Sequence, residues 1–224
     1  MLRTKQIFLA KDSDALQTLR RADPRLAPVI DAIGPVAYDV YLDDYPFLIW
    51  QIVGQMISGQ AAAKIGARLE TFCEGELTPD AIDALADEDL RRVGLSRPKI
   101  SYIRGINDAL RTGELNLREL RLLDDEEAMK KLRAVRGIGA WTATMLLIFV
   151  HDRQNIINAY DRCFMEVFQW LYGVEKVTPA VVKKQAEKWA PYASIAARYF
   201  YYALERGLTK LPPPKPDLDE QFDQ

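Results

Sequence analysis

The chain has 224 residues, of which 49% are hydrophobic and 28% are charged, and its net charge at neutral pH is −2. This size and composition exclude an intrinsically disordered protein and predict a substantial buried core. No apolar run approaches the ~20 residues that cross a bilayer, and the first residues lack the apolar core of a signal peptide, so we expect a cytoplasmic protein with no membrane partner. Cys73 and Cys163 are too few for a four-cysteine metal or iron–sulfur site.

Signals for helices recur along the whole chain, whereas alternating strand patterns are scarce. Thr78-Pro79-Asp80 and Thr178-Pro179 each place a capping side chain and a proline before apolar residues at helical spacing. The predicted helices lie near residues 13–20, 24–33, 46–58, 60–74, 79–85, 88–93, 98–111, 125–135, 140–150, 162–171, 179–187 and 193–206. Short connections between them predict a compact all-α protein.

Charge is distributed unevenly along the chain. Residues 91–137 hold twelve Lys or Arg against seven Asp or Glu, and they end at a glycine-containing turn. Residues 211–224 are rich in proline and acidic side chains, and they cannot continue a helix. We expect these last residues to form a tail that is mobile or laid over the surface. The low total charge therefore does not exclude a nucleic-acid partner.

The turn Val135-Arg136-Gly137-Ile138-Gly139 separates two predicted helices. Glycine at two alternate positions leaves backbone amides bare to grip a phosphate, because glycine tolerates the backbone angles and the close approach that this needs. We therefore expect the turn and Thr142 to contact nucleic acid. The alternative is that the glycines only end one helix and begin the next.

Four segments, taken in chain order, resemble those of one family. They are Asp23–Ile30, Phe47–Ala62, Val93–Arg104 and Leu132–Ala143. The resemblance is to the 3-methyladenine DNA glycosylase II family, within the helix-hairpin-helix DNA glycosylase superfamily. Asp161 stands where that superfamily carries its catalytic aspartate.

The resemblance implies a helix-hairpin-helix DNA glycosylase fold that is all-α, with two helical domains and a DNA-binding cleft between them. Enzymes of the family often carry an additional N-terminal β-rich domain, but this sequence begins almost at the entry helix, so we expect no N-terminal β domain. Residues 44–153 would form the central domain with the hairpin. Residues 1–43 and 154–210 would form the second, discontinuous domain, and residues 211–224 the tail.

The resemblance also implies base excision repair, by hydrolysis of the N-glycosidic bond of alkylated purines of the 3-methyladenine type. In relatives that also cut the backbone, a lysine after the hairpin forms a Schiff base. Trp141 occupies that position here, so we expect a monofunctional enzyme that leaves an abasic site. Its partner would be double-stranded DNA with alkylated bases, bound by a monomer that requires no cofactor. Carbonyls around Val135 could hold a structural Na⁺ or K⁺.

Asp161 is the candidate catalytic residue. Breaking a glycosidic bond develops oxocarbenium character on the sugar, and a fixed carboxylate stabilises that cation and orients or deprotonates the attacking water. An aspartate just before a helix is also a common N-cap. The two roles can coexist.

Base extrusion needs a side chain to fill the gap and a pocket to receive the base. In the family a residue of the Gly54-Gln55-Met56 loop fills the gap, and the adaptable Met56 suits this role unless it is an ordinary core methionine. Gln55 could hydrogen-bond the orphaned opposite base. For the pocket we nominate Trp141, Tyr201 and Tyr160, whose rings would attract a cationic base; the alternative is that the aromatic side chains near Tyr201 belong to the core.

Other functions stay open from the sequence. Within the enzyme class, the substrate could be uracil, hypoxanthine or an oxidised base. A non-catalytic helix-hairpin-helix DNA-binding module would need the hairpin but not Asp161, and a helical protein-interaction scaffold would need neither. The single histidine, His151, excludes a histidine metal cluster and is expected to end the helix at residues 140–150.

Overall fold

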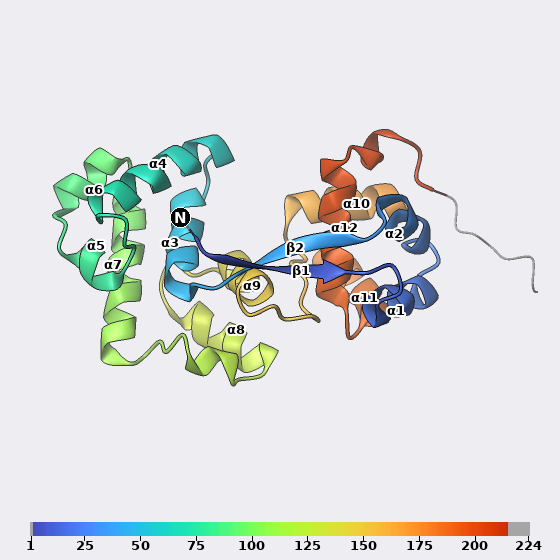
Figure 1. Ribbon diagram of the computed structural model, residues 1–224, viewed down its shortest axis with the longest axis horizontal. Helices are drawn as coiled ribbons and strands as arrows, with labels where there is room; N and C mark the ends of the chain where they lie inside the picture. Colours follow the sequence, from blue (N-terminus) through green and yellow to red (C-terminus); the bar gives the residue numbers. More distant parts are fainter. Residues whose placement is uncertain (1, 215–224) are drawn as a thin grey trace, which may run out of the picture. The chain divides into compact units, whose positions relative to one another are not determined.

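The computed structural model describes residues 2–214, which hold twelve α-helices and two short strands (Figure 1). The helices are α1 (Asp14–Ala22), α2 (Ala27–Ile33), α3 (Asp44–Gly54), α4 (Gly59–Phe72), α5 (Pro79–Asp83), α6 (Asp87–Val93), α7 (Arg97–Thr112), α8 (Asp125–Ala134), α9 (Ala140–Phe149), α10 (Arg162–Tyr172), α11 (Pro179–Ala186) and α12 (Ala193–Glu205). Every predicted helix is present, so the prediction of an all-α protein is confirmed. Within the described range, no helix combines the length and the apolar character that crossing a bilayer demands.

The two strands are a feature that the sequence prediction missed. β1 (Thr4–Leu9) and β2 (Val36–Tyr41) pair into a two-stranded sheet. In β2, the buried Val36, Tyr38 and Val40 alternate with exposed residues, which is the period-two pattern of a half-buried strand. The alternating pattern was therefore present but confined to six residues.

The chain forms two compact units. Unit 1 comprises the described residues up to Lys5 together with Val40–Asp152. Unit 2 comprises Gln6–Asp39 together with the described residues from Arg153 on. Most of the predicted proline-rich tail, residues 215–224, lies outside the described residues. Its beginning is tied to unit 2, because the Trp170 indole donates a hydrogen bond of 2.7 Å to the carbonyl of Leu211.

Helix α9 forms the centre of unit 1. Its residues from Thr142 to Ile148 are all buried, and it packs against α3 and α8. A helix that is buried on every side needs apolar residues around its whole circumference, which the sequence Met145-Leu146-Leu147-Ile148 supplies. Helix α9 therefore holds the end of α3 and the turn after α8 in fixed places.

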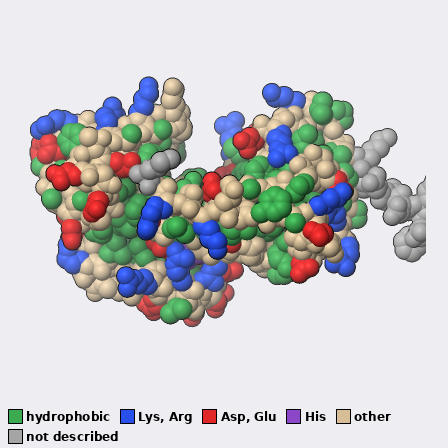
Figure 2. All heavy atoms as spheres, in the orientation of Figure 1, with side chains coloured by type: hydrophobic (Ala, Val, Ile, Leu, Met, Phe, Trp, Pro, Cys, Tyr) green, Lys and Arg blue, Asp and Glu red, His purple; other side chains and the backbone are tan. Residues whose placement is uncertain are grey.

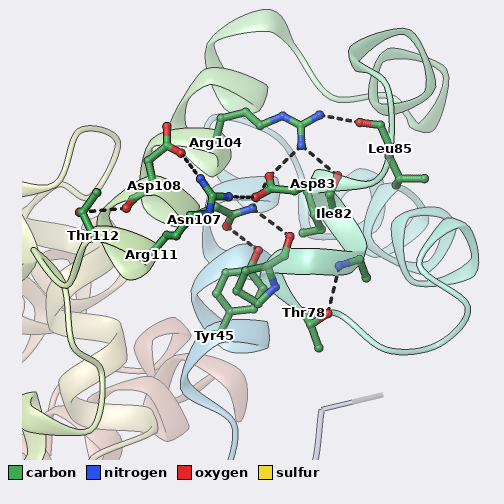
Figure 3. Close-up of polar contacts among 12 residues, drawn as sticks. Tyr45, Thr78, Ile82, Asp83, Leu85, Arg104, Asn107, Asp108, Arg111 and Thr112 are labelled. Atoms are coloured by element: carbon green, nitrogen blue, oxygen red, sulfur yellow. Dashed lines mark hydrogen bonds and ion pairs between the residues drawn. The ribbon is translucent and has the colours of Figure 1, made fainter.

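A partly buried polar cluster holds α7 against α3 and α5 (Figure 3). The Tyr45 hydroxyl donates to Asn107 Oδ1 at 2.7 Å, and Asn107 Nδ2 donates to Asp83 Oδ1 at 2.8 Å. Arg104 donates to the same Asp83 oxygen at 2.8 Å. Buried polar groups are stable only when they are paired in this way. The cluster fixes α7, whose first turns lie beneath the candidate site described below.

Unit 2 is built on aromatic side chains of α10 and α12. The rings of Phe164 and Phe200 stack with centroids 4.8 Å apart, and Trp189 meets Phe200 edge-on at 5.5 Å. Phe164, Phe200, Trp189 and Tyr199 are fully buried. The aromatic residues beside Tyr201 thus belong largely to the core, and this core anchors α10 just after Asp161.

Candidate functional site

The turn between α8 and α9 requires glycine at one of its two glycine positions. The Ile138 amide donates to the Val135 carbonyl at 3.1 Å, and Gly137 has a φ of 96°. A Cβ on Gly137 would lie 2.5 Å from Cβ and Cγ of Tyr102, so glycine is needed there for both backbone angle and space. Gly139 has a φ of −81° and open space around it. The backbone angle therefore requires glycine at residue 137 and not at residue 139, while close approach of a phosphate to Gly139 stays a prediction.

Most residues of the turn can contact a ligand only through their backbone. Ile138 and Thr142 are both buried, and the Ile138 amide already donates to the Val135 carbonyl. A phosphate contact at Thr142 would therefore run through its amide, and one at Ile138 would have to share the amide with Val135. Gly139 is the N-cap of α9, and the first amides of a helix have no acceptor within that helix. Arg136 is exposed, with its guanidinium 6.0 Å from the centre of the Tyr102 ring. The turn can therefore bind an anion through amides flanked by one arginine.

The loop after α3 presents Met56 to solvent. The Met56 side chain is 100% exposed, which excludes the alternative of a core methionine. Its φ of 58° is uncommon for a residue with a side chain, and the conformational energy that it costs must be offset by neighbouring contacts. An exposed thioether chain on a strained loop is suited to insertion between bases.

Gln55 connects this loop to the turn. Its Nε2 donates to the Gly137 carbonyl at 3.1 Å and to Thr142 Oγ1 at 3.3 Å. The prediction from the sequence is a hydrogen bond from Gln55 to the orphaned opposite base. With the amide donors directed at the turn, the amide oxygen is the group that remains for a base.

A concavity of about 430 Å³ in unit 1 joins these parts. It is lined by Gly54, Gln55, Met56, Gly139, Trp141 and Thr142. Trp141 is 40% exposed, so its ring is accessible to a ligand. The structure thus places three sequence predictions together in unit 1: the Met56 loop, the glycine turn and Trp141.

Asp161 begins α10 in unit 2. Its carboxylate accepts a hydrogen bond of 2.9 Å from the Phe164 amide, which makes it the N-cap of that helix. The side chain is half-buried, so the cap role does not seal it inside the protein. The capping role and the proposed catalytic role of Asp161 are therefore compatible, and the capping hydrogen bond fixes the carboxylate in place.

Tyr201 lies near Asp161, whereas Tyr160 points to solvent. Burial, with the neighbouring Asp161 charge as a second cause, raises the pKa of Tyr201 well above its ordinary value, so its hydroxyl stays protonated. Tyr160 is 63% exposed. Asp161 and Tyr201 thus both belong to unit 2, where the Asp161 charge acts on the Tyr201 hydroxyl, and Tyr160 is an accessible neighbour of Asp161 along the chain.

Two residues of α7 support the site, and the sequence reading did not single them out. Lys99 Nζ donates to the Val53 carbonyl at 2.7 Å, at the end of α3, and Tyr102 lies against Gly137. Burial lowers the pKa of Lys99. The requirement for glycine at residue 137 signalled a close neighbour but could not identify it.

The predicted ion site at Val135 rests on its carbonyl. One lone pair of that oxygen accepts the Ile138 amide, so a monovalent cation would use the other lone pair. This fits a carbonyl-coordinated ion and stays a prediction. Among residues 2–214, His, Cys, Asp and Glu form no group of three or more that could hold a metal ion.

His151 follows the end of α9, as expected, and its buried ring has a structural contact. Its Nε2 lies 2.5 Å from Asp44 Oδ1, and Arg121 donates to the other Asp44 oxygen at 2.8 Å. Although burial raises the pKa of Asp44, hydrogen bonds from His151 and Arg121 hold it below its ordinary value. This cluster fixes the start of α3.

The surface charge is mixed. On the face that Figure 2 shows, Lys and Arg side chains are interspersed with Asp and Glu side chains. Within residues 91–137, Arg104 and Arg121 pair with Asp83 and Asp44. Binding to DNA would therefore depend on local contacts, such as the amides of the turn, more than on a continuous positive surface.

Comparisons with known proteins match the chain to one family and to solved structures of similar fold. Residues 49–192 match a family described as "HhH-GPD superfamily base excision DNA repair protein". DNA-3-methyladenine glycosylase 1 of Schizosaccharomyces pombe is 31% identical over 163 residues, which cover 71% of this chain and 72% of that protein. A crystal structure of a Bacillus halodurans DNA-3-methyladenine glycosidase is 30% identical with a TM-score of 0.85, covering 92% of this chain and 96% of that one. A 3-methyladenine DNA glycosylase of S. pombe in complex with abasic DNA is 27% identical with a TM-score of 0.79, covering 91% and 100%.

Proposed function

Because the chain belongs to the HhH-GPD superfamily of base excision DNA repair proteins, we propose that it is a monofunctional DNA glycosylase for alkylated purines. It hydrolyses the N-glycosidic bond of bases of the 3-methyladenine type and leaves an abasic site. The observation that carries the proposal is Asp161: a half-exposed carboxylate fixed at the start of α10, in a chain whose relatives are named for this activity.

The chemistry needs little beyond one carboxylate. An N-alkylated purine is cationic, so it leaves with the electron pair of the bond to C1′ and becomes neutral without an acid to protonate it. The sugar then carries the positive charge, which the Asp161 carboxylate stabilises. Water adds to C1′ and gives up a proton, for which Asp161 is the candidate base. Asp161 thus acts on the sugar, while the charge of the damaged base makes it a good leaving group.

Unit 1 supplies the grip on DNA. The amides of the turn at Gly137 and Gly139 bind a backbone phosphate, and Met56 fills the space that the extruded nucleotide leaves. Extrusion costs a few kcal/mol and less where a lesion has already weakened the base pair. A phosphate contact carries no sequence information, so selection rests on that weakness and on the base pocket.

Aromatic side chains select the charged base. The accessible Trp141 ring offers a cationic purine both stacking and a cation–π attraction of up to ~2 kcal/mol when water is excluded. Tyr201 and Tyr160 are further candidates for this pocket. Because Trp141 has no amine, no Schiff base forms at that position, and the enzyme releases the base without cutting the backbone.

The partner is double-stranded DNA that contains alkylated bases, and the protein works as a monomer. The glycosidic step requires no cofactor. A Na⁺ or K⁺ at the Val135 carbonyl would stabilise the turn, and the enzyme would act in the cytoplasm.

Incubation with methylated DNA tests the proposal. The purified protein should release 3-methyladenine, identified by chromatography of the free bases, and should leave alkali-labile abasic sites. If the protein instead releases uracil, hypoxanthine or an oxidised purine from matched substrates and releases no methylated purine, the proposed substrate class is wrong. Binding to DNA without release of any base would contradict the enzyme itself.

A further inference from the structure

We propose that Gln55 is a positioning residue that couples the Met56 loop to the glycine turn. Insertion of Met56 and binding of the phosphate would then require one shared arrangement of the backbone. The inference rests on the proposed function, and it assigns Gln55 a role other than reading the orphaned base.

The hydrogen bonds of Gln55 carry this inference. Its Nε2 has two protons, and its two acceptors lie on either side of the turn: the Gly137 carbonyl at 3.1 Å and Thr142 Oγ1 at 3.3 Å. The acceptors are 82 and 87 residues away in sequence, so the contact joins separate elements. A carboxamide can bridge two acceptors in this way, whereas a carboxylate or an apolar side chain cannot.

The loop needs such a support. Met56 follows Gln55 directly and has the strained φ of 58°. A strained backbone conformation persists only where the surroundings determine it. The Gln55 side chain provides hydrogen bonds from this loop to the turn, and Lys99 holds the preceding Val53 carbonyl at 2.7 Å.

The turn needs the same support from its other side. Tyr102 lies against Gly137, which limits movement of the turn toward α7. The Gln55 amide holds the Gly137 carbonyl, and Thr142 is buried in the first turn of α9. The amides proposed to bind phosphate are thus held by α7 and by Gln55 together.

Substitutions distinguish coupling from base reading. Gln55→Leu removes both bonds, and Thr142→Val removes one acceptor while keeping the shape of the side chain. We expect Gln55→Leu to lower the single-turnover rate of base release about tenfold, and Thr142→Val to lower it less. The double variant should be no slower than Gln55→Leu, because Gln55→Leu already removes both hydrogen bonds. The loss should be equal whichever base, or abasic analogue, stands opposite the lesion. Gln17→Leu and Thr112→Val, which each remove a side-chain bond to a backbone carbonyl elsewhere, should match the wild type.

Hydrogen exchange supplies a readout that does not depend on activity. In the free protein, the Ile138 amide should exchange about tenfold faster in Gln55→Leu than in the wild type or in Gln17→Leu, because the turn opens more often. Thermal unfolding establishes that each variant is folded. If the wild type releases no base, the proposed function fails while this exchange experiment still tests the coupling.

Two results would overturn the inference. The first is a rate loss in Gln55→Leu that depends on the opposite base and that Thr142→Val does not share, which is the behaviour of a base reader. The second is unchanged Ile138 exchange in a folded Gln55→Leu protein.

Discussion

Individual residues of the site combine a structural and a functional task. Asp161 caps α10 with its carboxylate and is also the candidate catalyst. Gly137 allows the turn to form and also admits Tyr102 beneath it. In both cases the structural contact fixes the group that the chemistry needs, so a substitution must separate the two tasks before it can be interpreted.

The two glycines of the turn provide a matched comparison. Gly137→Ala should lower the free energy of unfolding by about 2 kcal/mol, because it combines a positive φ with a clash against Tyr102. It should also weaken binding to DNA, because the turn can no longer present its amides. Gly139→Ala should stay within about 0.5 kcal/mol of the wild type, since its φ is ordinary and the space is open. Urea denaturation measures both values, and equal losses in the two variants would contradict the geometry of the turn.

Elements were more predictable than the contacts between them. Capping residues and apolar spacing located every helix to within a few residues, because these signals are local. Strand β2 was not predicted, because its alternation of buried and exposed residues covers only six residues. The Gln55 contacts could not be predicted, because 82 residues separate Gln55 from Gly137 and no local pattern records which distant carbonyl a side chain meets.

The start of α3 should show a pH-dependent stability that the sequence did not suggest. The pKa of Asp44 is lowered in the folded state, so the ionised carboxylate stabilises the protein above the unfolded-state pKa and the effect is lost as pH falls through the folded pKa. Asp44→Asn should therefore be less stable than the wild type at pH 7, and the difference should narrow below about pH 4. Thermal unfolding between pH 7 and pH 3 measures this. Asp80→Asn, which removes an acidic side chain from the first turn of α5, is the control substitution. If the stability difference between Asp44→Asn and the wild type does not change with pH, the stabilising role of the Asp44 carboxylate is wrong.

At the scale of the whole molecule, the family and the candidate site could be predicted from four ordered segments and one aspartate. The candidate residues are divided between the two units. Unit 1 contains the turn, Met56 and Trp141, and unit 2 contains Asp161 and Tyr201. The role of Met56 could not be predicted from the sequence alone, because a core methionine and a methionine that inserts between bases give the same sequence pattern. The complete exposure of Met56 favours insertion.

A pair of N-cap substitutions tests whether the Asp161 carboxylate drives base release. Asp161→Asn and Asp124→Asn each replace a capping aspartate with asparagine, which caps about equally well, so both variants should fold and bind methylated DNA. Asp161→Asn should then lose single-turnover release of 3-methyladenine by about a hundredfold or more, while Asp124→Asn keeps the wild-type rate. If Asp161→Asn releases the base as fast as Asp124→Asn, the catalytic role of Asp161 is wrong.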